Sequence, residues 1–102
     1  MQNKILSMLG LSRRAGKLTM GHDPVLKAIK EKKANLILFA CDYSDNSKKE
    51  IERICSENSV TLLTLPYHKE ELSLSLGHYC GTVAVTDKGF SDKLEELIRS
   101  NR

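Results

Sequence analysis

The chain of 102 residues has no tryptophan, two prolines and three cysteines. The cysteines cannot all pair with one another because there are three of them, and none lies in a C-x-x-C motif: Cys41, Cys55 and Cys80. We therefore expect reduced thiols and no metal site. No apolar run approaches the roughly 18–20 residues that a helix needs to cross a bilayer. The N-terminus has no signal-peptide core, so we expect a cytoplasmic protein with no membrane partner.

The composition is that of a globular domain with an uneven charge. Hydrophobic residues make up 40% and charged residues 28%, which predicts one domain over residues 1–102 with a modest core. Residues 1–34 carry eight Lys and Arg against two Asp and Glu, a net of +6, whereas residues 35–102 carry eight against eleven, a net of −3. This asymmetry favours a basic face that binds an anionic partner. The alternative is that the lysines only keep one end of a helix in solvent.

The most informative stretch is residues 13–27, RRAGKLTMGHDPVLK. It predicts the basic end of one helix, a stop at Gly16, a very short strand, and a second helix with Asp23 as N-cap and Pro24 as first helical residue. A helix N-terminus carries free N–H groups and a partial positive charge, which suit a phosphate. Four basic residues and one helix start therefore fall within fifteen residues, a combination that predicts binding to a polyanion.

Apolar periodicity and turn residues divide the rest of the chain into strands and helices. Ser47 and Glu50 have capping-box spacing and predict a helix that starts at Ser47. Gly77 and Gly81 bracket a tight loop. Strands that alternate with helices predict an α/β layered domain with a small four-stranded sheet between helices. The predicted helices are 3–15, 24–32, 47–55, 69–76 and 91–100, and the predicted strands are 18–20, 36–41, 60–65 and 82–86.

Three motifs resemble one known family. They are Leu-Ser-Arg-Arg-Ala-Gly-Lys at 11–17, Gly-x-x-x-Val-x-Lys at 21–27 and Val-Ala-Val-Thr-Asp-Lys-Gly-Phe at 83–90. With the order of the elements, they resemble the kink-turn RNA-binding superfamily of archaeal ribosomal and box C/D RNA-binding proteins, and within it the bacterial YlxQ-type members. The resemblance covers about residues 4–98. It implies a three-layer α/β/α sandwich with a small mixed sheet, which binds a sharply bent RNA element.

The resemblance implies contacts at the start of the second helix, where a kink opens the RNA groove. Gly21 would let backbone approach backbone, His22 offers a donor and an acceptor, and Lys27 reaches a guanine edge or a phosphate. An Asp23–Lys27 ion pair, four residues apart, is the alternative. Pro24 stands where the family often has glutamate, so it lacks a carboxylate that would accept guanine N–H groups.

Two loops complete the implied site, residues 42–44 and 77–81. Tyr43 or Tyr79 would stack a base thrown out of the bend, an interaction worth roughly 1–3 kcal/mol. Each tyrosine fits equally well as a half-buried packing residue. Together the predicted RNA-binding residues are Arg13, Arg14, Lys17, Gly21, His22, Asp23, Lys27, Lys30, Tyr43, His78 and Tyr79.

The leading prediction is non-enzymatic binding of structured RNA by a chain that is monomeric when free, with ribosomal RNA and the ribosome as candidate partners and no cofactor. A second class is a protein-interaction or substrate-presenting accessory domain for an RNA-modifying system. A third is a small enzyme that uses His22 and Asp23, or the Thr86–Gly89 turn after the last strand. The sequence has no phosphate-binding glycine fingerprint and no nucleophile elbow, so we expect no catalytic residues.

Overall fold

A computed structural model describes residues 3–100 of the chain. Its four strands form one sheet in the order β1-β4-β2-β3, in which β2 and β3 are parallel and β4 runs antiparallel to both β1 and β2. The elements are α1 (Lys4–Arg14), β1 (Leu18–Met20), α2 (His22–Lys30), β2 (Leu36–Phe39), α3 (Asp45–Asn58), β3 (Thr61–Thr64), α4 (Lys69–Leu76), β4 (Thr82–Val85) and α5 (Lys88–Ser100).

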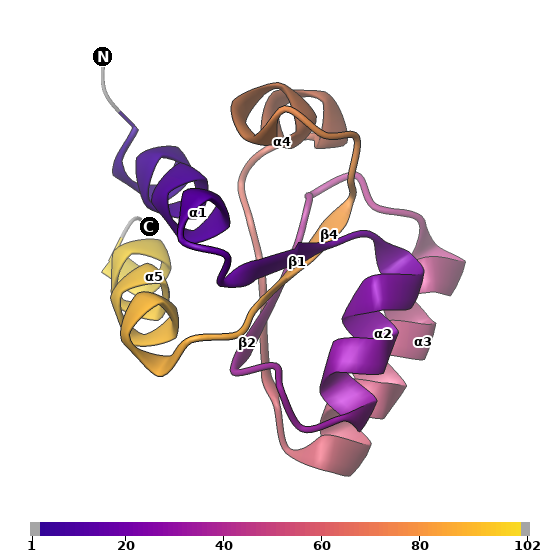
Figure 1. Ribbon diagram of the computed structural model, residues 1–102. Helices are drawn as coiled ribbons and strands as arrows, with labels where there is room; N and C mark the ends of the chain where they lie inside the picture. The colour runs from indigo at the N-terminus through magenta and orange to yellow at the C-terminus, as the bar shows by residue number, and fades with distance from the viewer. Residues whose placement is uncertain (1–2, 101–102) are drawn as a thin grey trace.

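Helices cover both faces of the sheet, so the predicted three-layer α/β/α sandwich with a mixed four-stranded sheet is confirmed. α2 and α3 lie on one face, whereas α1, α4 and α5 lie on the other (Figure 1). Side chains alternate between faces along a strand. Ile37 and Phe39 of β2 accordingly pack toward α2 and α3, and Leu36 and Leu38 pack toward the other layer. The continuous apolar run of this strand therefore serves two cores.

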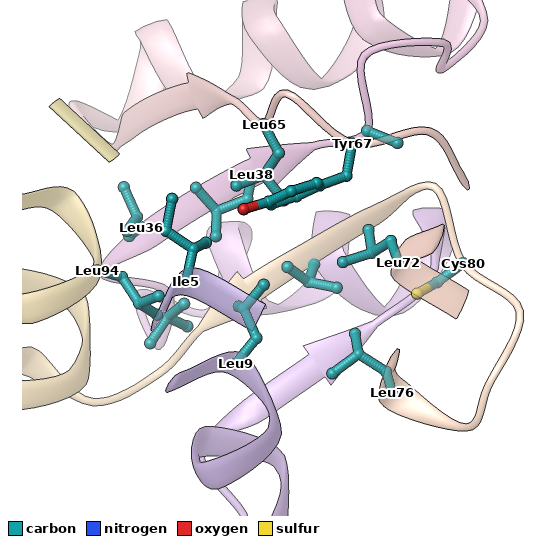
Figure 2. Packing of buried hydrophobic residues seen from close by; sticks show 13 residues of the cluster. Ile5, Leu9, Leu36, Leu38, Leu65, Tyr67, Leu72, Leu76, Cys80 and Leu94 are labelled. Carbon is teal, nitrogen blue, oxygen red and sulfur yellow. The ribbon is translucent and has the colours of Figure 1, made fainter. Parts of the chain in front are cut away.

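The larger core lies between the sheet and α1, α4 and α5 (Figure 2). Leu9 of α1, Leu72 of α4 and Leu94 of α5 meet there, each with no exposed surface. Tyr67 contributes its ring to this core and donates a hydrogen bond from its hydroxyl to Asn3 Oδ1 at 2.7 Å. Since Asn3 also accepts from the Leu6 N–H as N-cap of α1, this bond fixes the start of α1 over the sheet.

The predicted start of the second helix was wrong. α2 begins at His22, with Gly21 as its N-cap, instead of at Pro24 with Asp23 as the cap. Gly21 adopts φ 103°, a conformation that glycine takes readily. Its N–H donates to the Thr82 carbonyl at 3.0 Å. Pro24 falls within the first turn, where its missing N–H would have had no intrahelical partner.

Two other helix starts were also predicted too late. α3 begins at Asp45 because Ser44, not Ser47, is its N-cap, with the Ser44 hydroxyl accepting from the Ser47 N–H at 3.3 Å. α5 begins at Lys88, three residues before the predicted start, because Asp87 Oδ2 accepts from the Phe90 N–H at 2.9 Å. The Thr86–Gly89 segment thus forms the start of this helix, with Asp87 as its cap.

One edge of the sheet collects the segments singled out by the sequence. Met20 at the end of β1 and Phe39 at the end of β2 pair with the first residues of β4. The start of α2, the loop between β2 and α3, and the loop between α4 and β4 therefore meet there. A hydrogen bond from the Ala40 N–H to the Gly81 carbonyl, at 2.8 Å, joins the two loops. We call this the α2 edge, formed by residues 21–24, 40–44 and 77–81.

Candidate nucleic-acid interface

The start of α2 is open toward a ligand. No side chain among residues 3–100 caps it, because its N-cap is Gly21. Pro24 has no N–H and the Gly21 N–H is bonded to Thr82, so the free donors of the first turn are the backbone N–H groups of His22 and Asp23. Unsatisfied N–H groups together with the helix dipole make such a start a site for anions.

Three charged residues form an exposed stripe along α2, since positions i, i+4 and i+7 share one helix face. They are Asp23, Lys27 and Lys30, all exposed. The ion pairs found within residues 3–100 include none of the three, so the alternative of an Asp23–Lys27 pair is not what the structure shows. Both lysines are therefore available to an anion.

The His22 ring is bonded to protein through both nitrogens. Nδ1 lies 2.7 Å from the Tyr43 hydroxyl, and Nε2 lies 2.7 Å from Glu50 Oε1. A neutral ring satisfies both contacts when Nε2–H donates to the carboxylate and the Tyr43 hydroxyl donates to Nδ1. This hydrogen bond from His22 is the main cause that lowers the pKa of Glu50. Glu50 is a site residue that the sequence did not indicate, because its spacing from Ser47 suggested only a helix cap.

Tyr43 packs within the protein at the α2 edge. Its ring centroid lies 5.5 Å from that of Phe39 and 6.1 Å from that of His22. The ring also covers Gly81 so closely that a Cβ there would overlap it. Burial is the main cause that raises the pKa of the Tyr43 hydroxyl. The geometry therefore matches the packing alternative for Tyr43, and its stacking on RNA stays a prediction.

The loop between α4 and β4 presents a different kind of surface. Tyr79 is 73% exposed and His78 is exposed, while Leu74 on α4 is 79% exposed. The loop is tied to α4 because the Ser73 hydroxyl accepts from the Cys80 N–H at 3.0 Å. Beside it lies a hollow of about 620 Å³, large enough for a flat ring. Its walls include Asp42, Lys69, Ser73, Leu74, His78 and Tyr79.

The basic residues before α2 extend in different directions. Arg13 Nη1 would lie 3.6 Å from a Cβ at Gly77, so Arg13 reaches toward the loop between α4 and β4. Arg14 Nη1 would lie 3.7 Å from a Cβ at Gly10, so Arg14 folds back along α1. Lys17 precedes the three-residue strand β1, about 10 Å of extended chain away from Gly21.

The structure assembles no acid–base pair from the residues of the enzyme alternative. His22 has both ring nitrogens bonded and Asp23 is exposed beside it. Asp87 lies at the other end of β4, where it caps α5. Within residues 3–100 no three His, Cys, Asp or Glu side chains form a group that would hold a metal ion. No helix in this part of the chain has the length and apolar character to cross a membrane.

The fold and this edge define a class of protein: a small α/β/α domain that presents an open helix start, two unpaired lysines and an exposed aromatic loop. The chain belongs to the ribosomal protein L7Ae/L30e/S12e/Gadd45 family, whose sequence profile matches residues 3–95. It is 38% identical over 96 residues to the RNA-binding protein YlxQ of Bacillus subtilis, covering 89% of this chain and 91% of the relative. Within the family it is a YlxQ-type member, as the sequence motifs predicted.

Other relatives extend the similarity beyond bacteria. The chain is 33% identical to the large ribosomal subunit protein eL30 of Tetrahymena thermophila, over 92% of each chain. Among solved structures, a protein of unknown function from Bacillus halodurans superposes with a TM-score of 0.90 at 30% identity, covering 96% of this chain and 99% of that one. The Giardia lamblia 15.5 kD RNA-binding protein superposes with a TM-score of 0.76 at 14% identity and supports the fold alone.

Proposed function

We propose that this chain is one non-enzymatic, cytoplasmic RNA-binding domain that binds structured RNA with its α2 edge. The observation that carries the proposal is the uncapped start of α2 with the unpaired Lys27 and Lys30 on its outer face. The relatives described as an RNA-binding protein and as a ribosomal protein support it. The ribosome and its RNA are the proposed partners, and the free chain is proposed to be monomeric and to need no cofactor.

The proposed RNA class is the kink-turn or a similarly bent element. In regular A-form RNA the major groove is too narrow for side chains, so a bend that opens it suits the start of a helix. Lys27 would contact a base edge or phosphate, and Gly21 and Asp23 would lie where the backbones approach. Lys30 would contact phosphate farther along α2.

Basic residues outside α2 would add attraction to phosphates without reading the bases. Arg13 lies beside the loop between α4 and β4, and Arg14 and Lys17 lie toward the other end of β1. Neutralising all three should weaken binding to different RNAs alike and flatten the salt dependence by up to about three units, roughly one for each phosphate contact.

The hollow beside Tyr79 is the proposed place for a base thrown out of the bend. Its mixed lining offers an aromatic face, the apolar Leu74 and polar groups from His78 and Lys69. Base stacking on an aromatic ring is worth roughly 1–3 kcal/mol. The exposed Leu74 also favours a second candidate function, an interaction surface for a protein of an RNA-modifying system.

Titration with two synthetic RNAs tests the proposal. One is a kink-turn with tandem sheared G·A pairs, and the other replaces those pairs with Watson–Crick pairs. We expect Lys27→Ala to weaken binding to the kink-turn by at least ~1 kcal/mol, with little effect of Lys93→Ala on α5, which removes the same charge from the opposite layer. Binding that does not weaken with salt would contradict an RNA interface and favour the second candidate.

A further inference from the structure

The first turn of α2 lacks the anchors that usually fix a helix start. Gly21 has no side chain to cap the helix. As a glycine it also loses more conformational freedom on folding than any other residue. Pro24 cannot donate a hydrogen bond. The backbone bond from Gly21 to Thr82 ties the cap to β4. Among residues 3–100, the side-chain hydrogen bonds recorded for this turn are those of the His22 ring.

Glu50 is an acidic side chain beside this basic surface, and its position requires an explanation. It takes no part in starting α3, because Ser44 caps that helix. A carboxylate near a phosphate site weakens binding by repulsion. Its partner is His22 at 2.7 Å, and Lys30 and Arg53 lie close enough to act on the same carboxylate. The His22 ring therefore holds the Glu50 carboxylate against α2, while the Glu50 side chain stays 49% exposed.

Tyr43 holds the other nitrogen of the ring and is itself fixed from two strands. Phe39 of β2 packs on one side of its ring, and Gly81 before β4 leaves the space that the ring fills. Its hydroxyl then meets His22 Nδ1 at 2.7 Å. A chain of contacts therefore runs from Gly81 through Tyr43 and His22 to Glu50.

We propose that His22 is a positioning residue, held by Glu50 and Tyr43, which fixes the first turn of α2 so that its N–H groups and Lys27 are in place before RNA binds. This inference rests on the proposed function. Fixing a binding element beforehand removes an ordering cost from association. It also assigns Glu50 an effect on RNA affinity without contact to RNA.

The test compares two variants of Glu50 with the parent, using the two synthetic RNAs above. Glu50→Gln and Glu50→Ala both remove the charge, but only glutamine keeps an oxygen that accepts from His22 Nε2–H. We expect the alanine variant to bind the kink-turn about fivefold to tenfold more weakly than the glutamine variant, the value of one hydrogen bond. Matched controls are Glu52→Gln and Glu52→Ala, which change an exposed glutamate of the same helix two positions on, where its side chain does not share the face of Glu50, and these two variants should bind equally.

A double-mutant cycle shows whether Glu50 acts through His22. In a His22→Ala background, Glu50→Ala and Glu50→Gln should differ by less than about twofold. Thermal unfolding of every variant confirms that the titrations are made on folded protein. Equal affinities of Glu50→Gln and Glu50→Ala would overturn the proposal, as would an unchanged difference between them in the His22→Ala background.

Failure of the proposed function is a separate outcome. If the parent binds neither RNA, NMR of the His22 ring decides the inference. A ring that carries its proton on Nε2 and loses this fixed state in Glu50→Ala, but not in Glu50→Gln, supports the positioning role. A ring that exchanges between tautomers in the parent as freely as in Glu50→Ala overturns it.

Discussion

Gly81→Ala is expected to destabilise the protein, although glycine-to-alanine changes often stabilise. Gly81 is buried, and a Cβ there would overlap two atoms of the Tyr43 ring and approach Lys69 Cδ to 3.2 Å. The Lys69 side chain can move aside because its end is flexible. The Tyr43 ring cannot move without leaving Phe39 and the hydrogen bond to His22.

The magnitude follows from these contacts. Forcing an extra carbon into a packed site costs about 1–3 kcal/mol. Displacing the ring from the His22 hydrogen bond costs about 1 kcal/mol more. The free energy of unfolding should therefore fall by roughly 2–4 kcal/mol, and Tm by about 10–20 °C for a chain of this length.

Urea unfolding at equilibrium measures this change, with Gly10→Ala as the matched control. A Cβ at Gly10 would meet only Arg14 Nη1 at 3.7 Å, an ordinary contact within α1, so this variant should gain about 0.5–1 kcal/mol. If the cost comes from the ring, Gly81→Ala should cost much less in a Tyr43→Ala background. A cost below about 0.5 kcal/mol, or the same cost in both backgrounds, would refute the reasoning.

Three further predictions concern thiols, acid stability and RNA choice. Cys41 is exposed, whereas Cys55 and Cys80 are buried, and burial raises the pKa of Cys55 to about 11. The Cys41 thiol should therefore react quickly with a disulfide reagent, and the other two thiols should react only when the protein unfolds. Rapid reaction of all three thiols in the folded protein would contradict this packing. The hydrogen bond from His22, with smaller effects of Arg53 and Lys30, lowers the pKa of Glu50 below its ordinary 4.5. The stability this group adds is therefore present above about pH 4.5 and lost as pH falls, so the difference in unfolding free energy between parent and Glu50→Gln should shrink on acidification. Pro24→Glu adds a carboxylate that accepts guanine N–H groups and repels the phosphates of any other RNA. The ratio of the affinity for the kink-turn to the affinity for its Watson–Crick counterpart should therefore rise. A constant or lower ratio would place the helix start away from the G·A pairs.

Much of the fold was predictable because each element carries its own signal. The helix predicted over 69–76 matches α4, since Leu72 and Leu76 lie four residues apart and Gly77 takes the left-handed conformation that ends the helix. The strand predicted over 36–41 contains β2, whose four residues are all buried. The helix starts were less predictable because several residues in a row can cap. Ser44 and Ser47 are both good N-caps, and the surrounding structure selected the first.

The candidate site was only partly predictable because its contacts join distant positions. The exposed basic residues of α2, Lys27 and Lys30, follow from local sequence. The bond between His22 and Glu50 spans 28 positions, and no local pattern indicates it. The same holds for Gly81, which has to be glycine because the ring of Tyr43, far away in sequence, fills the space that a Cβ would need.

The mixed sheet explains why these distant positions meet. β4 lies between β1 and β2 and runs antiparallel to both, so the residues that lead into β4 lie where β1 and β2 end. If β4 ran parallel to its neighbours, the loop with Tyr79 and Gly81 would enter the sheet at the opposite edge, away from the start of α2. The contact between Gly81 and Tyr43 would then be impossible, and with it the support for His22. The direction of one strand therefore brings an aromatic loop, a helix start and a positioning histidine to the same edge.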